Sequence, residues 1–131
     1  MLSRKHLATL LVLALLVTAG AAAVSPSRRT HKNLKVLPQD ISDPMLDSIM
    51  ISYNKALGVN CDFCHVQATG LPDSLDYASD RNHMKENARE MMRMTILINK
   101  TYFYYDKTQR PEYLNVVNCM TCHRGTAYPV E

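Results

Sequence analysis

The sequence predicts an all-α fold: one small domain in which two similar helical segments follow each other. Three observations support this fold class. Two stretches carry apolar residues at helical spacing, each is bounded by residues that begin or end helices, and a short cysteine–histidine motif occurs twice. The chain has 131 residues, which leaves room for one such domain.

The first helix is predicted to begin in the stretch ISDP at 41–44. Ser42 can act as the N-cap, and Pro44 is tolerated in the first turn. Gly58 is a natural stop because glycine readily adopts the left-handed conformation that ends many helices. The apolar face between these residues consists of Leu46, Ile49, Met50, Tyr53 and Leu57. The first cysteine motif follows directly and is expected to open a short helix.

The second helix is longer. Residues 67–79 are predicted to form a loop, because Gly70 and Pro72 interrupt regular structure. Asp80 can cap the helix that follows, which is expected to run to about Tyr105. Its apolar face carries Met84, Ala88, Met91, Thr95, Ile98 and Tyr102. Residues 106–115 form a second predicted loop, and the second cysteine motif then begins another short helix.

The N-terminal residues 1–23 resemble a secretory signal peptide. Arg4 and Lys5 precede an apolar run at 7–17, and three alanines at 21–23 offer a cleavage site. Cleavage after Ala23 is expected, and an uncleaved N-terminal anchor is the alternative. Basic residues flank both sides of the run, so the positive-inside rule gives no strong preference for the anchor. Residues 24–40 are a polar, basic lead-in, and 41–131 form the domain. In either case we expect a periplasmic or otherwise extracytoplasmic protein. The net charge is +3, and basic residues cluster in the N-terminal part of the chain. This distribution does not indicate nucleic-acid binding.

All four cysteines lie in two copies of Cys-x-x-Cys-His, formed by Cys61, Cys64 and His65 and by Cys119, Cys122 and His123. Disulfides are common in exported proteins, and two such cysteine pairs could bind one zinc ion. Neither use explains the histidine after each second cysteine, whereas c-type haem attachment uses all three residues. On a helical turn, positions i, i+3 and i+4 share one face. Both thiols can then bond to one porphyrin, and the imidazole can reach its iron from the same side. We therefore expect two covalently attached haem c groups.

The sixth ligand of each iron is expected to be a methionine. Met50 lies on the helix directly before the first motif, and Gly58 turns the chain back between them. For the second haem, Met91 continues the apolar line of its helix. Met94 lies about 60° from Met91 on the helical wheel and stays open as an alternative. Apart from that alternative, Met84, Met92 and Met94 are expected to pack in the core or against the edge of the haem. A distal histidine, either His31 or His83, is a further alternative, although His31 is expected to be solvated and His83 exposed.

Several stretches together resemble the cytochrome c subunit of photosynthetic reaction centres. They are NLKVLP (33–38), ALGVNCDFCH (56–65), ASD (78–80), AREMMRMT (88–95), IN (98–99) and CMTCHRG (119–125). The resemblance implies that each haem segment is a helix beside the haem, a turn and a motif helix. The resemblance also implies that Met50 and Met91 are axial ligands of the two haem irons. Well-known members have four haem segments, whereas this chain has two and is similar to short dihaem relatives. A histidine that ligates another haem in the four-haem proteins is matched here by Tyr105.

These features predict an electron carrier rather than an enzyme. No acid–base pair, nucleophile elbow or phosphate-binding loop is present. The resemblance implies redox partner proteins, among them a membrane complex or a photosynthetic reaction centre. A peroxidase-like haem enzyme with one open iron, and a structural subunit of a cytochrome filament or membrane complex, remain alternatives. Because a small domain buries limited apolar area, we also expect folding to depend on haem attachment.

Overall fold

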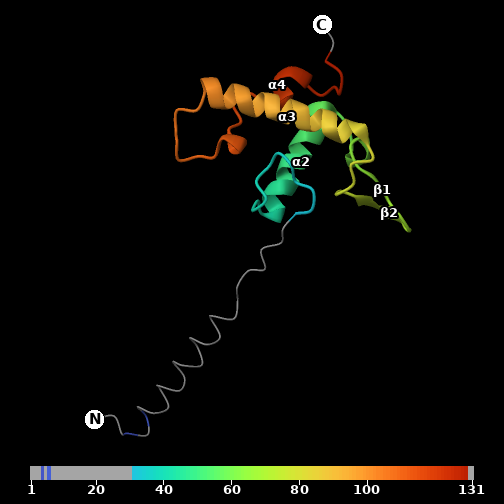
Figure 1. Ribbon diagram of the computed structural model, residues 1–131, viewed down its shortest axis with the longest axis horizontal. Coiled ribbons are helices and arrows are strands. Elements are labelled where there is room, and N and C mark those ends of the chain that lie inside the picture. Colours follow the sequence, from blue (N-terminus) through green and yellow to red (C-terminus); the bar gives the residue numbers. More distant parts are fainter. Residues whose placement is uncertain (1–3, 5, 7–30, 130–131) are drawn as a thin grey trace.

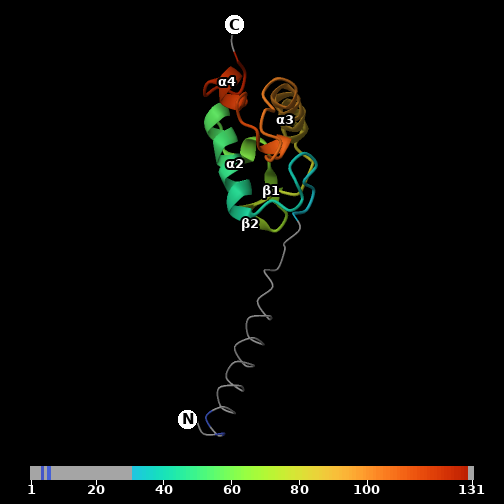
Figure 2. The ribbon, with the colours of Figure 1, turned by 90° about the vertical axis from the view of Figure 1, so that its left-hand side faces the viewer.

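The computed structural model describes residues 4, 6 and 31–129. The predicted signal peptide and the first part of the lead-in lie almost wholly outside the described residues. Figures 1 and 2 show α2 (Asp43–Leu57) and α3 (His83–Tyr102) crossing at a steep angle. A hairpin of β1 (Val66–Ala68) and β2 (Leu71–Asp76) lies near one end of α3. Two 3₁₀ turns, η1 (Cys61–Phe63) and η2 (Pro111–Tyr113), and the short helix α4 (Cys119–His123) complete the described elements. Within the described ranges, no helix is both long enough and apolar enough to span a membrane.

The prediction of an all-α fold is wrong, because residues 66–76 form a two-stranded antiparallel sheet instead of a loop. Val66 pairs with Asp76, and the register shifts by the turn. Gly70 has φ of 78°, which suits the tight connection of a hairpin. Pro72 is tolerated since both strands of a two-stranded sheet are edge strands. The residues that were interpreted as loop-forming are thus the turn and edge residues of a hairpin.

The boundaries of α2 agree with the prediction. The helix begins at Asp43 with Ser42 at the N-cap position, although the Ser42 side chain makes no capping hydrogen bond. Gly58 ends the helix at φ of 65° and donates its backbone N–H to the Asn54 carbonyl. The predicted stop at this glycine is therefore confirmed.

The helix α3 begins and ends at residues other than those predicted. The N-cap is Asn82 and not Asp80: the Asn82 side chain accepts a hydrogen bond from the Met84 N–H at 3.0 Å. The same side chain donates to the Phe63 carbonyl at 3.0 Å, which ties the helix start to the first cysteine motif. The helix ends at Tyr102, three residues before the predicted end.

The part of the lead-in that the structure describes packs into the core. Leu37 from the lead-in and Ile41 directly after it are buried together with Met92 from α3, and this is the main apolar cluster among the described residues. The expectation that His31 is solvated is wrong: its side chain is largely buried, and Nε2 hydrogen-bonds the Ile41 carbonyl at 2.9 Å. His83, in contrast, is exposed at the start of α3, as predicted. The apolar core is small, which fits a domain completed by another group.

Asp80 connects the lead-in to α3. Its carboxylate accepts hydrogen bonds from Lys35 at 2.7 Å, from Arg89 at 2.9 Å and from Asn33 at 2.8 Å. These partners, with Lys35 the largest contributor, hold the pKa of Asp80 well below its usual range. Arg89 is itself buried and also donates to Glu86 and to the Asn33 carbonyl. The charged groups of this cluster are thus paired with one another.

Candidate haem-binding site

The first cysteine motif opens the short helix that the sequence predicts, although this helix, η1, is a 3₁₀ helix of a single turn. The backbone N–H groups of Cys64 and His65 both donate to the Cys61 carbonyl, at 3.3 and 3.0 Å. This turn keeps the three motif residues at helical spacing although η1 ends at Phe63. The Cys61 thiol is accessible and lies 3.4 Å from the Asn54 side-chain nitrogen on α2.

His65 lies in a setting that favours neutral imidazole. Burial, and then the charges of Lys85 and Arg89, lower its pKa, while Asp76 opposes the shift. Neutral imidazole is the form that binds a metal. Its Nδ1 atom is buried and has no hydrogen-bond partner among the described residues. The ring stands edge-on to Tyr77, with 5.0 Å between the ring centroids.

The second motif forms the predicted short helix, α4. The Thr121 side chain accepts a hydrogen bond from the Asn118 backbone N–H at 3.1 Å, which stabilises the helix start. His123 is the last residue of α4, and its Nδ1 lies 3.0 Å from the Thr126 carbonyl. A carbonyl can only accept, so Nδ1 carries the proton and Nε2 keeps a free lone pair. This arrangement is typical of histidines that ligate a metal through Nε2.

The four thiols are free and form no disulfide in this structure. Burial raises the pKa of both Cys64 and Cys119, so these two thiols stay protonated. Among the residues that the structure describes, no three His, Cys, Asp or Glu side chains converge as they would around one ion. The two cysteine pairs are therefore not arranged as a single four-cysteine zinc site.

Contact between two glycines brings the two motifs to the same end of α2. The Gly125 N–H donates to the Ala56 carbonyl at 2.8 Å. A Cβ atom on Gly58 would lie only 2.1 Å from the Gly125 carbonyl oxygen, so the backbones meet more closely than any side chain would allow. Figure 2 shows α4 packed on this end of α2. The helix before the first motif thus also supports the second motif.

Asn99 holds the segment that leads into the second motif, a role that the sequence analysis did not predict. Its side chain is 1% exposed. The amide nitrogen donates to the carbonyls of Leu114 and Val117 at 3.0 and 2.7 Å, and the amide oxygen accepts from the Val117 N–H at 2.8 Å. Asn99 belongs to the short IN stretch, so the resemblance pointed to the position without assigning it a function.

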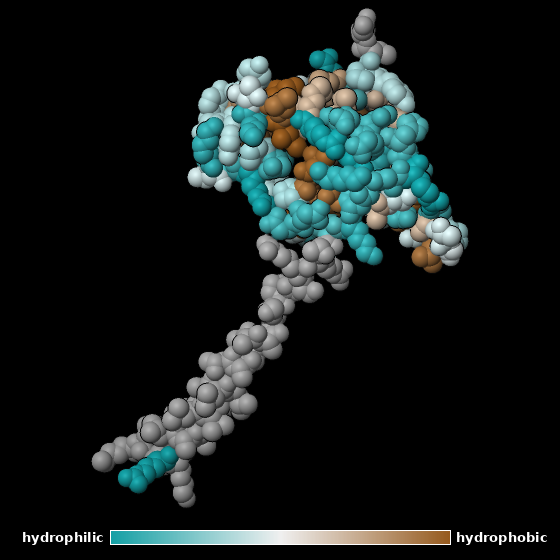
Figure 3. Space-filling model, in the orientation of Figure 1, coloured by the Kyte–Doolittle hydropathy of each residue, from teal (hydrophilic) through white to brown (hydrophobic). Residues whose placement is uncertain are grey.

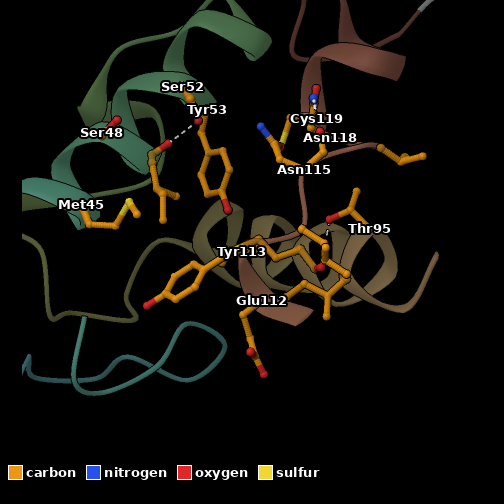
Figure 4. Close-up of a pocket in the computed structure, with 15 residues that line it drawn as sticks. Met45, Ser48, Ser52, Tyr53, Thr95, Glu112, Tyr113, Asn115, Asn118 and Cys119 are labelled. Atoms are coloured by element: carbon orange, nitrogen blue, oxygen red, sulfur yellow. Dashed lines mark hydrogen bonds between the residues drawn. The ribbon is translucent and has the colours of Figure 1, made fainter. Parts of the chain in front are cut away.

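A pocket of about 260 Å³ lies between α2, α3 and residues 112–119. Tyr53, Met92 and Thr95 line it from the two helices, and Cys119 forms part of the opposite wall. Figure 4 shows the Tyr53 ring projecting from α2 toward α3, with Asn118 and Cys119 across the pocket. A cysteine of the second motif therefore faces a preformed hollow.

The methionines of α3 point in different directions. Met92 is 8% exposed and belongs to the core, as predicted, whereas Met91 and Met94 are 44% and 43% exposed. Figure 3 shows a strip of apolar surface over and beside the middle of α3. Met50 on α2 is partly buried against the cluster around Leu37. Met91 and Met94 are therefore both available to a group outside the polypeptide, and the axial roles of Met50 and Met91 stay predictions.

Together these residues fit haem c. Each motif presents two thiols and one imidazole on a single turn, and the second imidazole has its metal-binding nitrogen free. The exposed methionine thioethers of α3 are suitable iron ligands. The motif residues would hold haem, which would supply one-electron redox chemistry.

Comparison with known proteins agrees with this geometry. Residues 18–131 match the family model "Photosynthetic reaction centre cytochrome C subunit". The chain is 31% identical over 103 residues to the photosynthetic reaction center cytochrome c subunit of Roseobacter denitrificans. That match covers 77% of this chain but 26% of the relative, so the chain spans about a quarter of the relative's length. No solved structure matches. A cytochrome c family implies covalently bound haem c. The chain belongs to the photosynthetic reaction centre cytochrome c subunit family.

Proposed function

We propose that this protein is an exported dihaem cytochrome that carries single electrons between redox partners. The observation that supports this most is the second motif, where the hydrogen bond from His123 to the Thr126 carbonyl leaves Nε2 free for iron. The first motif repeats the same residues on one turn. Two such sites account for every cysteine in the chain.

We assign Met50 and Met91 as the sixth ligands. Haem iron held by histidine and methionine has no open position, which suits electron transfer at a raised potential. Met91 is exposed while its neighbour Met92 is committed to the core, so the orientation of α3 supports Met91 over Met92. Met94 has the same exposure as Met91 and is the competing choice. The line that Met91 continues with Met84 along α3 favours Met91.

The partners are redox proteins on the extracytoplasmic side of a membrane, with a photosynthetic reaction centre as the first candidate. The similarity to a photosynthetic reaction center cytochrome c subunit supports this, although the chain spans only 26% of that relative. The predicted N-terminal signal peptide or anchor supports a location outside the cytoplasm. Gene neighbours that encode a reaction centre would support a photosynthetic partner, and their absence would favour a respiratory one.

The test is a spectroelectrochemical titration of the holoprotein combined with carbon monoxide exposure of its reduced form. An electron carrier with two saturated irons should take up two electrons in one-electron steps, stay low-spin and leave carbon monoxide unbound. Binding at one iron, together with turnover of hydrogen peroxide, would instead support a peroxidase-like enzyme. Alanine variants at Met91, Met92 and Met94, compared with near-infrared magnetic circular dichroism, then identify the methionine of the second haem.

A further inference from the structure

The two motif histidines differ in what their Nδ1 atoms contact. At the second motif, the His123 Nδ1–H donates to the Thr126 carbonyl at 3.0 Å. At the first motif, the Nδ1 of His65 is buried, and it is the one side-chain nitrogen or oxygen in the described part of the chain that is buried without a partner. Histidines that ligate a metal almost always donate their second ring N–H to a carbonyl, a carboxylate or water. The first motif therefore lacks an acceptor that the second motif has.

Thr126 is held so that its carbonyl stays against His123. The backbone N–H and the hydroxyl of Thr126 both donate to the His123 carbonyl, at 3.0 and 2.9 Å. The two residues thus bind each other in both directions, because the imidazole of His123 donates back to Thr126. The neighbouring Gly125 fixes this turn to α2 through its hydrogen bond to the Ala56 carbonyl at 2.8 Å. The acceptor of the second motif is therefore part of an ordered turn.

Positive charge lies close to the first histidine. The His65 ring stands 5.0 Å from the Tyr77 ring, and the Tyr77 carbonyl accepts a hydrogen bond from Lys85 Nζ at 2.9 Å. The Lys85 side chain is 11% exposed, so solvent screens its charge only weakly. Lys85 and Arg89 each act more strongly on the His65 imidazole than the opposing charge of Asp76 does.

The carboxylates that pair with these cations do not cancel them. Asp80 lies 3.3 Å from Lys85, but it is shared with Lys35 at 2.7 Å and with Arg89 at 2.9 Å. Glu86 pairs with Arg89 at 2.7 Å. Two carboxylates thus face three cations in this cluster, and the first motif lies beside its surplus positive charge.

Both differences act on the iron in the same direction. An acceptor on the Nδ1–H increases electron donation by the imidazole and stabilises ferric iron, so it lowers the potential. Positive charge near the iron disfavours the ferric state, which is the more positive one, so it raises the potential. The second motif has the acceptor, and the first motif has the positive charge.

We propose that the two haems have unequal potentials, with Thr126 as a positioning residue that lowers the potential of the second haem and Lys85 as a residue that raises that of the first. The proposal rests on the proposed function, because it needs haem at both motifs. When the chain holds a single electron, that electron resides on the first haem: the first iron is ferrous and the second is ferric, and no proton or other bond is exchanged.

The experiment compares wild-type holoprotein with Thr126→Val and Lys85→Gln. Thr126→Val removes the hydroxyl that helps to hold the carbonyl, and Thr126→Ser is the matched control that keeps it. Lys85→Gln removes the charge but keeps an N–H donor, and Lys85→Arg is the control that keeps the charge. Intact mass first shows whether each protein carries two haems, and redox titration then gives two midpoint potentials. Proton NMR of the ferrous protein with ¹⁵N-labelled histidine reports the Nδ1–H protons, because a hydrogen-bonded N–H proton lies further downfield.

In the wild type, the equilibrium constants for reducing the two haems should differ by about tenfold, which is about 59 mV for one electron. One Nδ1–H proton should lie downfield of the other. Thr126→Val should raise the lower potential, by about twofold to fivefold in the equilibrium constant, and move the downfield proton upfield. Lys85→Gln should lower the higher potential by a similar factor, and both controls should match the wild type.

Equal potentials in the wild type, two Nδ1–H protons equally far downfield, or a Thr126→Val effect on the higher potential would overturn the proposal. So would a Lys85→Gln effect on the lower potential. A Thr126→Val protein that is less stable but has unchanged potentials would show that Thr126 is only structural, and this result also contradicts the proposal. A wild-type chain with fewer than two haems would overturn the proposed function itself, and the mass measurement detects that separately.

Discussion

Replacing Asn99 with alanine should strongly destabilise the protein and loosen the second motif. The Asn99 side chain makes three hydrogen bonds to the backbone of residues 114–117, with distances between 2.7 and 3.0 Å, and is 1% exposed. Each such bond contributes about 1 kcal/mol net, so their loss costs about 3 kcal/mol. Unpaired backbone groups left in the interior add to this cost. Small domains have only about 5–15 kcal/mol in total, so the effect is a large fraction of the stability.

Guanidinium denaturation of the holoprotein, followed by circular dichroism, measures this loss. Asn115→Ala is the matched control, because Asn115 is exposed in the same segment and its side chain makes no hydrogen bond within the described residues. The control should change the unfolding free energy by less than about 0.5 kcal/mol, as surface substitutions do. If Asn99→Ala costs less than about 1 kcal/mol, the value of one hydrogen bond, the proposed role of Asn99 in holding this segment is wrong.

Three other substitutions test the remaining features. Gly58→Ala should destabilise the fold more than Gly70→Ala: both have positive φ, but only at Gly58 would a Cβ atom meet backbone, at 2.1 Å; equal losses in thermal melts would contradict this close contact. Asp80→Asn should lower the melting temperature at pH 7, and this difference should shrink below about pH 3.9, the ordinary aspartate pKa. The sign follows from the lowered pKa of Asp80, whose stabilisation is lost as the carboxylate takes up a proton; a pH-independent difference would refute it. Met50→Ala and Met91→Ala should each remove one methionine-ligated haem in near-infrared magnetic circular dichroism, and an unchanged count would exclude that methionine.

The two long helices and the end of α2 could be predicted because their signals are local. Apolar spacing and Gly58 act within a few residues of the structure that they specify. The sequence did not predict the hairpin because Gly70 and Pro72 are as typical of hairpins as of loops, and both strands are short. Asp80 was assigned to the wrong role because its partners Lys35 and Asn33 lie more than forty positions earlier in the chain.

In the candidate site, too, features that depend on neighbouring residues could be predicted, whereas contacts between distant residues could not. The motif residues could be proposed as haem ligands from the sequence because their chemistry depends on spacing within five residues. The supporting contacts could not, because they join distant segments. Asn99 holds residues that lie 15 and 18 positions later, and Gly58 meets Gly125 from the far end of the chain. Tyr53 appeared in the sequence as one apolar position of a helix, and only the folded chain brings it to Cys119.

The central claim is that each cysteine motif carries one covalently bound haem, and intact mass spectrometry of the purified holoprotein tests it most directly. The denatured chain should carry a mass increase of two haem groups. The increase should fall to one haem when Cys61 and Cys64, or Cys119 and Cys122, are replaced together by serine. A wild-type chain with no haem mass, or with stoichiometric zinc in native spectra instead, would contradict the claim.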